Sequence, residues 1–157
     1  MSNQLEHTYR VVIQTTPRQV WDALTTSKFT TQYYFGLSAE SDWRSGSPYV
    51  MTRRGETAFD GTVVHSEPSR RLLQTVNVKF LPMTNQEELT IQWDIEPLGE
   101  ACSVAITHKG SSVDAELFAQ VTAACPELLC GLKTLLESGR SLRMERPATV
   151  AVTTDVV

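Results

Sequence analysis

Three histidines and three cysteines are the residues of this chain best suited to acid–base, nucleophilic or metal chemistry. His108 is the most informative, because it shares the phase of a predicted strand with Val104 and Ile106. A histidine on the inward face of a sheet can orient a ligand or move a proton. The alternative is a histidine at the rim of the sheet, bonded to backbone or water. We interpret His7 as a solvated side chain and His65 as a strand-end residue before a turn.

The cysteines indicate free thiols. Cys102, Cys125 and Cys130 cannot all pair within one chain, and the sequence has neither a C-x-x-C motif nor a Cys/His cluster at zinc spacing. Free thiols are typical of a reducing cytosol, so we expect a cytoplasmic protein whose thiols are mostly buried. Cys125 falls in the apolar stripe of a predicted helix and is most simply a small hydrophobic residue. We predict no metal and no cofactor.

Catalytic motifs give no support to an enzyme. The chain lacks G-x-S-x-G, H-E-x-x-H, a P-loop and G-x-G-x-x-G. We therefore predict no catalytic residue and favour a binding protein. Arg53 stands out among the basic residues, because it faces inward if Met51 does. There it could pair with an acidic group of a ligand or with Glu56.

Apolar side chains suited to enclosing a ligand recur in the inward phase of the predicted strands. Trp93 lies mid-strand in this phase, either as an aromatic wall for a ligand or as ordinary core. The aromatic run Tyr33-Tyr34-Phe35 predicts a lid over a cavity or an anchor for its helix. The predicted ligand-binding residues are Trp93, Ile91, Ile106, His108, Arg53, Phe59, Tyr33, Phe35, Cys125 and Val121.

The elements that position these residues begin with a strand and two short helices. Residues 5–13 contain alternating and β-branched apolar positions, which predict a strand. Thr16 and Gln19 flank Pro17 in the pattern of a capping box, which predicts a helix to about residue 26. A second short helix is predicted over residues 27–35.

The middle of the chain predicts an antiparallel sheet. Between about residues 37 and 109, strand-like runs are separated by short turn clusters, with no helical pattern between them. The clearest strand is 87–96, with 101–108 as its partner, and 71–80 has one apolar phase that includes Phe80. Gly61 is a natural position for a bulge or bend.

The last element is a predicted helix over about residues 114–138, with a continuous apolar stripe and Gly139 as its C-cap. Pro126 would kink this helix, and the alternative is two helices, the second starting at Pro126. We predict one domain over residues 1–143 and a loose tail over 144–157.

Composition excludes several classes of protein. The chain has 157 residues, suited to a single domain, and 41% of them are apolar, which argues against disorder. Its net charge of -4 argues against a nucleic-acid or membrane-surface binder. No stretch approaches the ~20 apolar residues that span a membrane, so we predict no membrane span.

A sheet with one apolar face and a helix with one apolar stripe must bury these surfaces against each other. The predicted fold is therefore α+β, with a curved antiparallel sheet of six to seven strands wrapped around a long C-terminal helix. This order of elements resembles the helix-grip fold of the START / SRPBCC (Bet v I-like) superfamily. Within this superfamily, the chain resembles most closely the homologues of the activator of Hsp-ninety ATPase. The segments that carry the resemblance are TTPRQVWDALTT, YYFG with SDWRSGSP, DGTVVHSEPSRRLLQT and LLCGLKTLLESGRSL. The likeness covers about residues 5–143.

The resemblance implies three functions. The superfamily binds lipids, sterols, polyketides or other apolar ligands, so the first is non-catalytic binding of a small apolar molecule between sheet and helix. The second is a co-chaperone-like domain that binds a chaperone or another protein, and the third is an enzyme acting on an apolar ligand. The family often has Gly-Trp before the Pro of the last helix, where this chain has Ala124-Cys125. This departure either enlarges the cavity or is compensated elsewhere. We expect a monomer or a homodimer.

Overall fold

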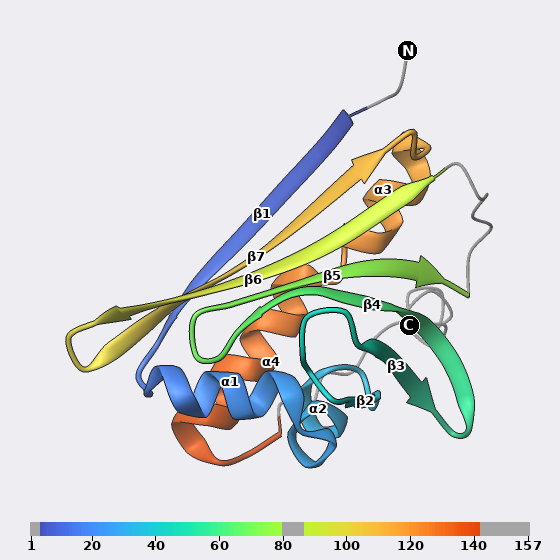
Figure 1. Cartoon of the computed structure of the whole chain (residues 1–157). Coiled ribbons are helices and arrows are strands. Elements are labelled where there is room, and N and C mark those ends of the chain that lie inside the picture. The colour runs from blue at the N-terminus through green and yellow to red at the C-terminus, as the bar shows by residue number, and fades with distance from the viewer. Residues whose placement is uncertain (1–3, 80–86, 142–157) are drawn as a thin grey trace, which may run out of the picture.

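The computed structural model describes residues 4–79 and 87–141. Seven strands and four helices follow in the order β1 (Gln4–Ile13), α1 (Pro17–Thr25), α2 (Ser27–Tyr33), β2 (Ser38–Ser41), β3 (Pro48–Arg53), β4 (Glu56–Glu67), β5 (Arg71–Val78), β6 (Glu88–Leu98), β7 (Ala101–Ser111), α3 (Ala115–Thr122) and α4 (Cys125–Ser138). The strands form one antiparallel sheet in the order β1-β7-β6-β5-β4-β3-β2, and the helices lie on one face of it (Figure 1). The predicted helix-grip fold is confirmed.

The sheet curves because β3 and β4 are irregular. The pairing register shifts between Met51 and Thr52 and again between Val63 and His65. Between these two irregularities, Gly61 lies so close to β5 that an added Cβ would be 2.2 Å from the backbone oxygen of Thr75. Only glycine tolerates this approach. The bend predicted at Gly61 therefore has a physical basis, and the register shift itself falls two residues later.

The core lies between the inner face of the sheet and the helices. On β6 the residues Leu89, Ile91, Trp93 and Ile95 are all buried, as their alternation predicts. The inner phase of β7 continues this face, and Leu132 of α4 is fully buried. Burial of such side chains is the main stabilising term of a domain of this size.

The ends of the helices follow their capping residues. Thr16 Oγ1 accepts a hydrogen bond from the Gln19 amide at 3.2 Å, and the Thr16 amide donates to the Gln19 Oε1 at 3.4 Å, so the predicted capping box is confirmed. Gly139 ends α4 with φ +75°, and its amide donates to the Leu135 carbonyl. A left-handed residue here is the usual helix terminator.

The predicted helix over 114–138 is two helices, as the alternative stated. α3 ends at Thr122 and α4 begins at Cys125, with Pro126 in its first turn. Proline fits that position because the amide it lacks has no partner within the helix there. The break lies over the inner face of the sheet, and this position matters for the candidate site.

Two predictions fall on residues outside the described ranges: the inward placement of Phe80 and the loose tail over 144–157. Among the helices of residues 4–79 and 87–141, none is long and apolar enough to cross a membrane.

Candidate ligand-binding chamber

A small cavity of about 40 Å³, here called the chamber, lies between the sheet and the α3–α4 break. Its walls come from the end of α2, from the inner face of β4 to β7, and from the two helices that meet at the break. The lining residues are Tyr34, Phe35, Phe59, Val76, Val78, Ile91, His108, Val121, Ala124, Cys125 and Leu128. It is a mostly apolar space with few polar groups, which is the composition expected of a small-molecule site.

Six of the ten predicted ligand-binding residues meet at the chamber. They come from α2 and its following turn, three strands and both C-terminal helices: Phe35, Phe59, Ile91, His108, Val121 and Cys125. Their role as ligand contacts stays a prediction.

Three further predicted residues belong to the packed core next to the chamber. Trp93 and Ile106 are Cα partners on β6 and β7, and both are fully buried. Tyr33 is also buried, and its hydroxyl donates to the Ala23 carbonyl at 2.8 Å, which ties α2 to α1. The tyrosine therefore anchors its helix, while Tyr34 and Phe35 after it reach the chamber.

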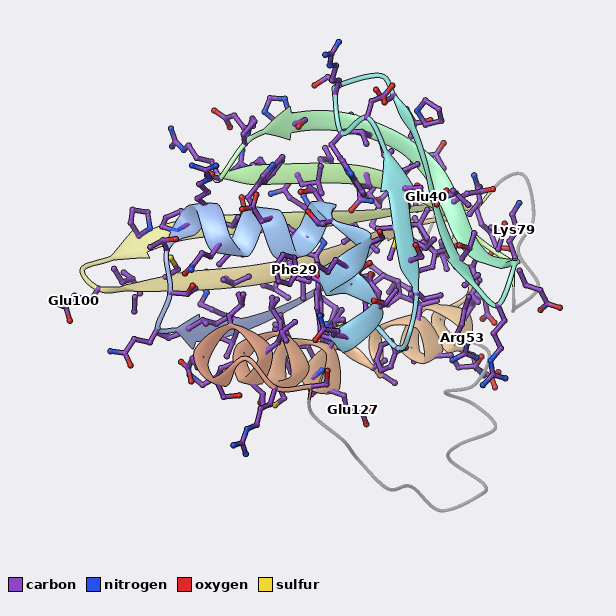
Figure 2. All side chains as sticks on the ribbon, turned by 90° about the horizontal axis from the view of Figure 1, so that it is seen from below. Phe29, Glu40, Arg53, Lys79, Glu100 and Glu127 are labelled. Carbon is purple, nitrogen blue, oxygen red and sulfur yellow. The ribbon has the colours of Figure 1, made fainter. Side chains whose placement is uncertain are left out.

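Arg53 lies outside the chamber wall. Its Nη1 donates to the Phe35 carbonyl at 3.2 Å, and Figure 2 shows it toward the edge of the molecule. Met51 faces the core, and Arg53, two residues further along β3, is partly buried beside Gly36 in the turn that follows α2. Its contact with the Phe35 carbonyl holds this turn.

The polar end of the chamber is built from His108 and Cys125. His108 is 4% exposed, and its Nδ1 lies 3.6 Å from the Cys125 Sγ. Burial lowers the pKa of His108 to about 4, with a smaller contribution from His7, which is its Cα partner on β1. Burial also raises the pKa of the Cys125 thiol to about 12. Near neutral pH the two groups therefore meet as imidazole and thiol, both uncharged.

His7 is not the solvated side chain that the sequence suggested. Its Nδ1 is buried and finds no hydrogen-bond partner within the described part of the chain, while its ring packs on Tyr9 at 4.5 Å. The expectation was wrong because β1 pairs with β7, which places His7 directly opposite His108. A sequence pattern within β1 alone could not show that pairing.

The thiols differ in accessibility. Cys102 and Cys125 are buried as predicted, and the Cys102 Sγ contacts the Thr15 carbonyl at 3.2 Å. Cys130 is exposed, which corrects the expectation that all three are mostly buried. It lies five residues from Cys125, and this spacing places it on another face of α4. Residues 4–79 and 87–141 contain no group of three or more His, Cys, Asp or Glu that could hold a metal.

The structure adds five wall residues that the predicted site did not include: Tyr34, Val76, Val78, Ala124 and Leu128. For three of these residues the apolar periodicity of the sequence did contain a signal. Val76 and Val78 share the apolar phase of β5, and Leu128 lies in the apolar stripe of the last helix. For Ala124 the periodicity gave no signal, because it lines the chamber only through the break between α3 and α4; the resemblance to the family had singled it out only as part of the Ala124-Cys125 pair.

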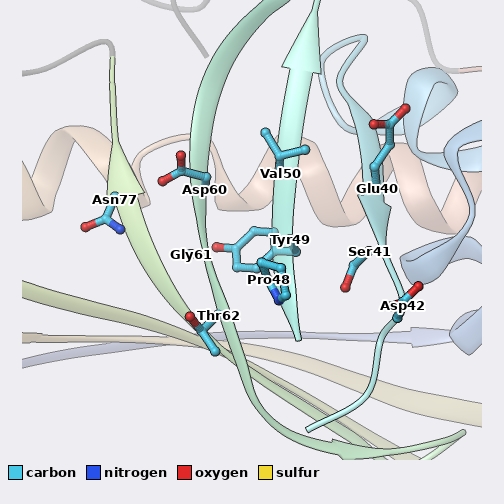
Figure 3. A pocket seen from close by; sticks show the side chains of 10 residues that line it. All are labelled: Glu40, Ser41, Asp42, Pro48, Tyr49, Val50, Asp60, Gly61, Thr62 and Asn77. Carbon is cyan, nitrogen blue, oxygen red and sulfur yellow. The ribbon is translucent and has the colours of Figure 1, made fainter. Parts of the chain in front are cut away.

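A second hollow lies on the outer face of the sheet. This groove of about 750 Å³ is open to solvent and crosses β2 to β5 (Figure 3). Glu40, Val50, Asp60 and Asn77 are successive Cα partners across the four strands and form a row along it. Asp42 adds another carboxylate to its lining. The groove is acidic, because its described lining includes the three carboxylates of Glu40, Asp42 and Asp60 and no basic side chain. Lys79 reaches Asp60 only in a long ion pair of 3.7 Å.

The sequence was compared with the profiles of known protein families. The profile of the family described as "Activator of Hsp90 ATPase homolog 1-like protein" matches residues 14–137. The chain belongs to this family. The match runs from the end of β1 to the last turn of α4, so it includes every wall of the chamber. A search of curated proteins finds no significant match.

Solved structures support the same fold at low sequence identity. The Aha1 dimer from Colwellia psychrerythraea is 20% identical, with a TM-score of 0.71, covering 86% of this chain and 98% of that one. CalU16 from Micromonospora echinospora is 14% identical, with a TM-score of 0.69 and coverage of 99% and 92%. DynU16, a putative protein in the dynemicin biosynthetic locus, is 22% identical, with a TM-score of 0.65 and coverage of 88% and 49%. These similarities establish the shared fold.

Proposed function

We propose that this member of the family binds a small apolar molecule in the chamber and does not itself catalyse a reaction. The observation that carries the proposal is the convergence of aromatic and aliphatic walls from four parts of the fold on one space with a buried polar end. Burial of apolar surface would supply most of the affinity, at roughly 25 cal/mol per Å² removed from water.

The chamber must widen to accept a ligand of ordinary size. Small-molecule sites commonly enclose about 300–1,000 Å³, whereas the chamber encloses about 40 Å³. Two of its walls lie where helices end. Tyr34 and Phe35 follow the last residue of α2, and Phe35 has a φ of +53°, while Ala124 lies between α3 and α4. Residues at helix ends can move without breaking the hydrogen bonds between strands or those inside a helix.

The non-catalytic part of the proposal rests on the state of the polar groups. A nucleophilic cysteine needs a lowered pKa, and a general base needs a pKa near the operating pH. Burial instead raises the pKa of Cys125 to about 12 and lowers the pKa of His108 to about 4. Their contact therefore supports a role in orienting a ligand more than a role in activating a nucleophile.

A titration with the neutral fluorescent dye Nile red tests the proposal. Wild type should bind the dye, and Cys125→Trp should bind it more weakly, because the larger ring fills the chamber. Cys130→Trp is the matched control: it adds the same ring to an exposed position of the same helix and should leave binding unchanged. Val121→Ala removes wall atoms and should bind at least as tightly as wild type. If neither wild type nor Val121→Ala binds the dye, the proposal is wrong.

The acidic groove favours a second candidate function, a co-chaperone-like interaction through the outer face of the sheet. Such a function needs an exposed charged or apolar surface, and Glu40, Asp42 and Asp60 supply one of negative charge. The partner would be a chaperone of the Hsp90 class or another protein with a basic surface, in a stress-response role. Binding to purified Hsp90 should then weaken in a Glu40→Lys/Asp42→Lys variant and persist in Cys125→Trp. No binding by wild type would remove this candidate.

A further inference from the structure

Among the described residues, those that line the chamber include no charged side chain. The polar lining residues are Tyr34, His108 and Cys125, and the remaining lining residues are apolar. Arg53, the candidate cation from the sequence, directs a guanidinium nitrogen to the Phe35 carbonyl and is not a lining residue. An ion that entered the chamber would therefore lose its water without gaining an opposite charge, which is the most unfavourable way to bury an ion.

The three polar wall groups are also held in their neutral forms. Burial raises the pKa of Tyr34 far above its usual value and that of Cys125 to about 12, and it lowers the pKa of His108 to about 4. A carboxylate could gain a counter-ion only if His108 took up a proton. The burial of His108 opposes that step, and so does His7, its partner across the strand pair. Near neutral pH the chamber offers hydrogen bonds without charge.

His108 has hydrogen-bonding capacity that the protein does not use. A neutral imidazole has one nitrogen that donates and one that accepts. Nδ1 meets the Cys125 Sγ, and Nε2 makes no hydrogen bond within the described part of the chain. Opposite His108 on the neighbouring strand, the His7 Nδ1 is buried and without a partner there. Buried polar atoms of proteins are nearly always paired, so this nitrogen, together with the unused Nε2 of His108, indicates a place for a polar atom of a guest.

We infer that the chamber selects its ligand by charge, accepting neutral apolar molecules that carry one hydrogen-bonding oxygen and excluding carboxylates of the same shape. This inference rests on the proposed function, because it names the chemical class of the ligand of the same site. His108 is the specificity-determining residue: its ring bonds to the ligand oxygen and has no charge to offer an anion. Alcohols, phenols and ketones belong to the accepted class.

Three small probes of matched shape test the inference on wild-type protein at pH 8. Acetophenone and benzoate have the same planar outline and differ in charge, and toluene provides the ring without an oxygen. Binding is followed by shifts of the Val121, Ala124 and Leu128 amide signals in ¹⁵N-resolved NMR spectra. We expect acetophenone and toluene to shift these signals, and acetophenone to bind at least about tenfold more tightly than benzoate.

A variant assigns the selectivity to His108. His108→Phe keeps a ring of similar size and removes both nitrogens, so it should weaken acetophenone by about fivefold and leave toluene unchanged. His65→Phe is the matched control, because His65 is an exposed histidine on β4 that pairs with Glu67 away from the chamber. It should change neither probe.

The outcomes separate the inference from the proposed function. Benzoate binding as tightly as acetophenone would overturn the inference and leave the proposed function standing. Absence of any shift with toluene and acetophenone would overturn the proposed function, and the inference with it. If His108→Phe fails to fold, the comparison of probes on wild type still decides, because it needs no variant.

Discussion

The two ends of the inner face of the sheet are closed differently. At one end, here called the packed end, the second half of α4 covers β1: Leu132 and Ile13 are fully buried. The Lys133 ammonium donates to the Val12 carbonyl at 2.6 Å, and the Glu137 carboxylate accepts from the Gln14 amide at 2.8 Å. At the other end, the helices break between Thr122 and Cys125, and the chamber remains beneath the break.

The contrast separates stability from binding within one core. The packed end joins the last helix to the edge strand by side-chain hydrogen bonds to backbone as well as by apolar burial, so both elements are fixed there. The chamber end has apolar walls but leaves space and ring nitrogens unused. A site that admits a ligand needs such incomplete packing, and the fold can tolerate it because the other end is complete.

The largest test of this contrast is a pair of truncations. Leu132→Ala should lower the free energy of unfolding by about 2–5 kcal/mol, because it opens a cavity in the packed end. Val121→Ala should cost about 1 kcal/mol or less, because Val121 is only partly buried and already borders the chamber. Denaturant unfolding at constant slope measures both. Equal losses, or a loss well under 1 kcal/mol for Leu132→Ala, would show that the packed end is misassigned.

Acid should destabilise the protein through the chamber end. The pKa of His108 is about 4 in the folded protein, below its ordinary value of 6.5, so the folded state binds fewer protons than the unfolded state. The stability associated with neutral His108 is therefore complete above about pH 6.5 and is lost as the pH falls toward 4. The shift corresponds to about 3 kcal/mol.

The control for this pH dependence is again the pair of histidine variants. Unfolding of His108→Phe should lose the dependence between pH 6.5 and 4, whereas His65→Phe should keep it. Carboxylates also titrate near the lower limit, so the difference between variant and wild type is the quantity to measure. A His108→Phe profile parallel to wild type across this window would assign the pH dependence elsewhere.

Sequence patterns predicted which residues lie on the inner face of the sheet. They predicted less well which of these residues border the chamber and which belong to the packed core. Alternation placed both Ile91 and Trp93 on the inner face, but only Ile91 borders the chamber. Two residues of one phase differ because the helix above them breaks, and the break depends on the whole assembly of α3, α4 and sheet. Proline at 126 was the one local signal of it.

Two further residues show the same limit. Arg53 follows Met51 at a spacing of two on β3, but it lies at the end of the strand, where its guanidinium contacts the Phe35 carbonyl and is not part of the chamber wall. His7 looked solvated because its partner strand lies about 100 residues away, and only the β1–β7 pairing brings it against His108.

The smallest expected difference is in the reactivity of two buried thiols, one at the chamber end and one at the packed end. Cys125 belongs to the chamber, and Cys102 pairs across the sheet with Ile13 at the packed end. Burial raises the pKa of both thiols, so neither forms much thiolate and each reacts only when its surroundings open. Widening of the chamber would expose Cys125 alone, whereas exposure of Cys102 requires β1 to separate from β7.

Timed alkylation with peptide mass spectrometry should therefore label Cys130 first, Cys125 later and Cys102 last. Acetophenone should slow only Cys125, because a bound ligand holds the chamber closed around it. A Cys130→Ser variant removes the fast reaction and leaves the two buried thiols to be compared directly. If Cys102 reacts together with Cys125, both thiols are exposed by one global unfolding event. The two ends would then open as a unit, and the chamber would have no separate motion with which to admit a ligand.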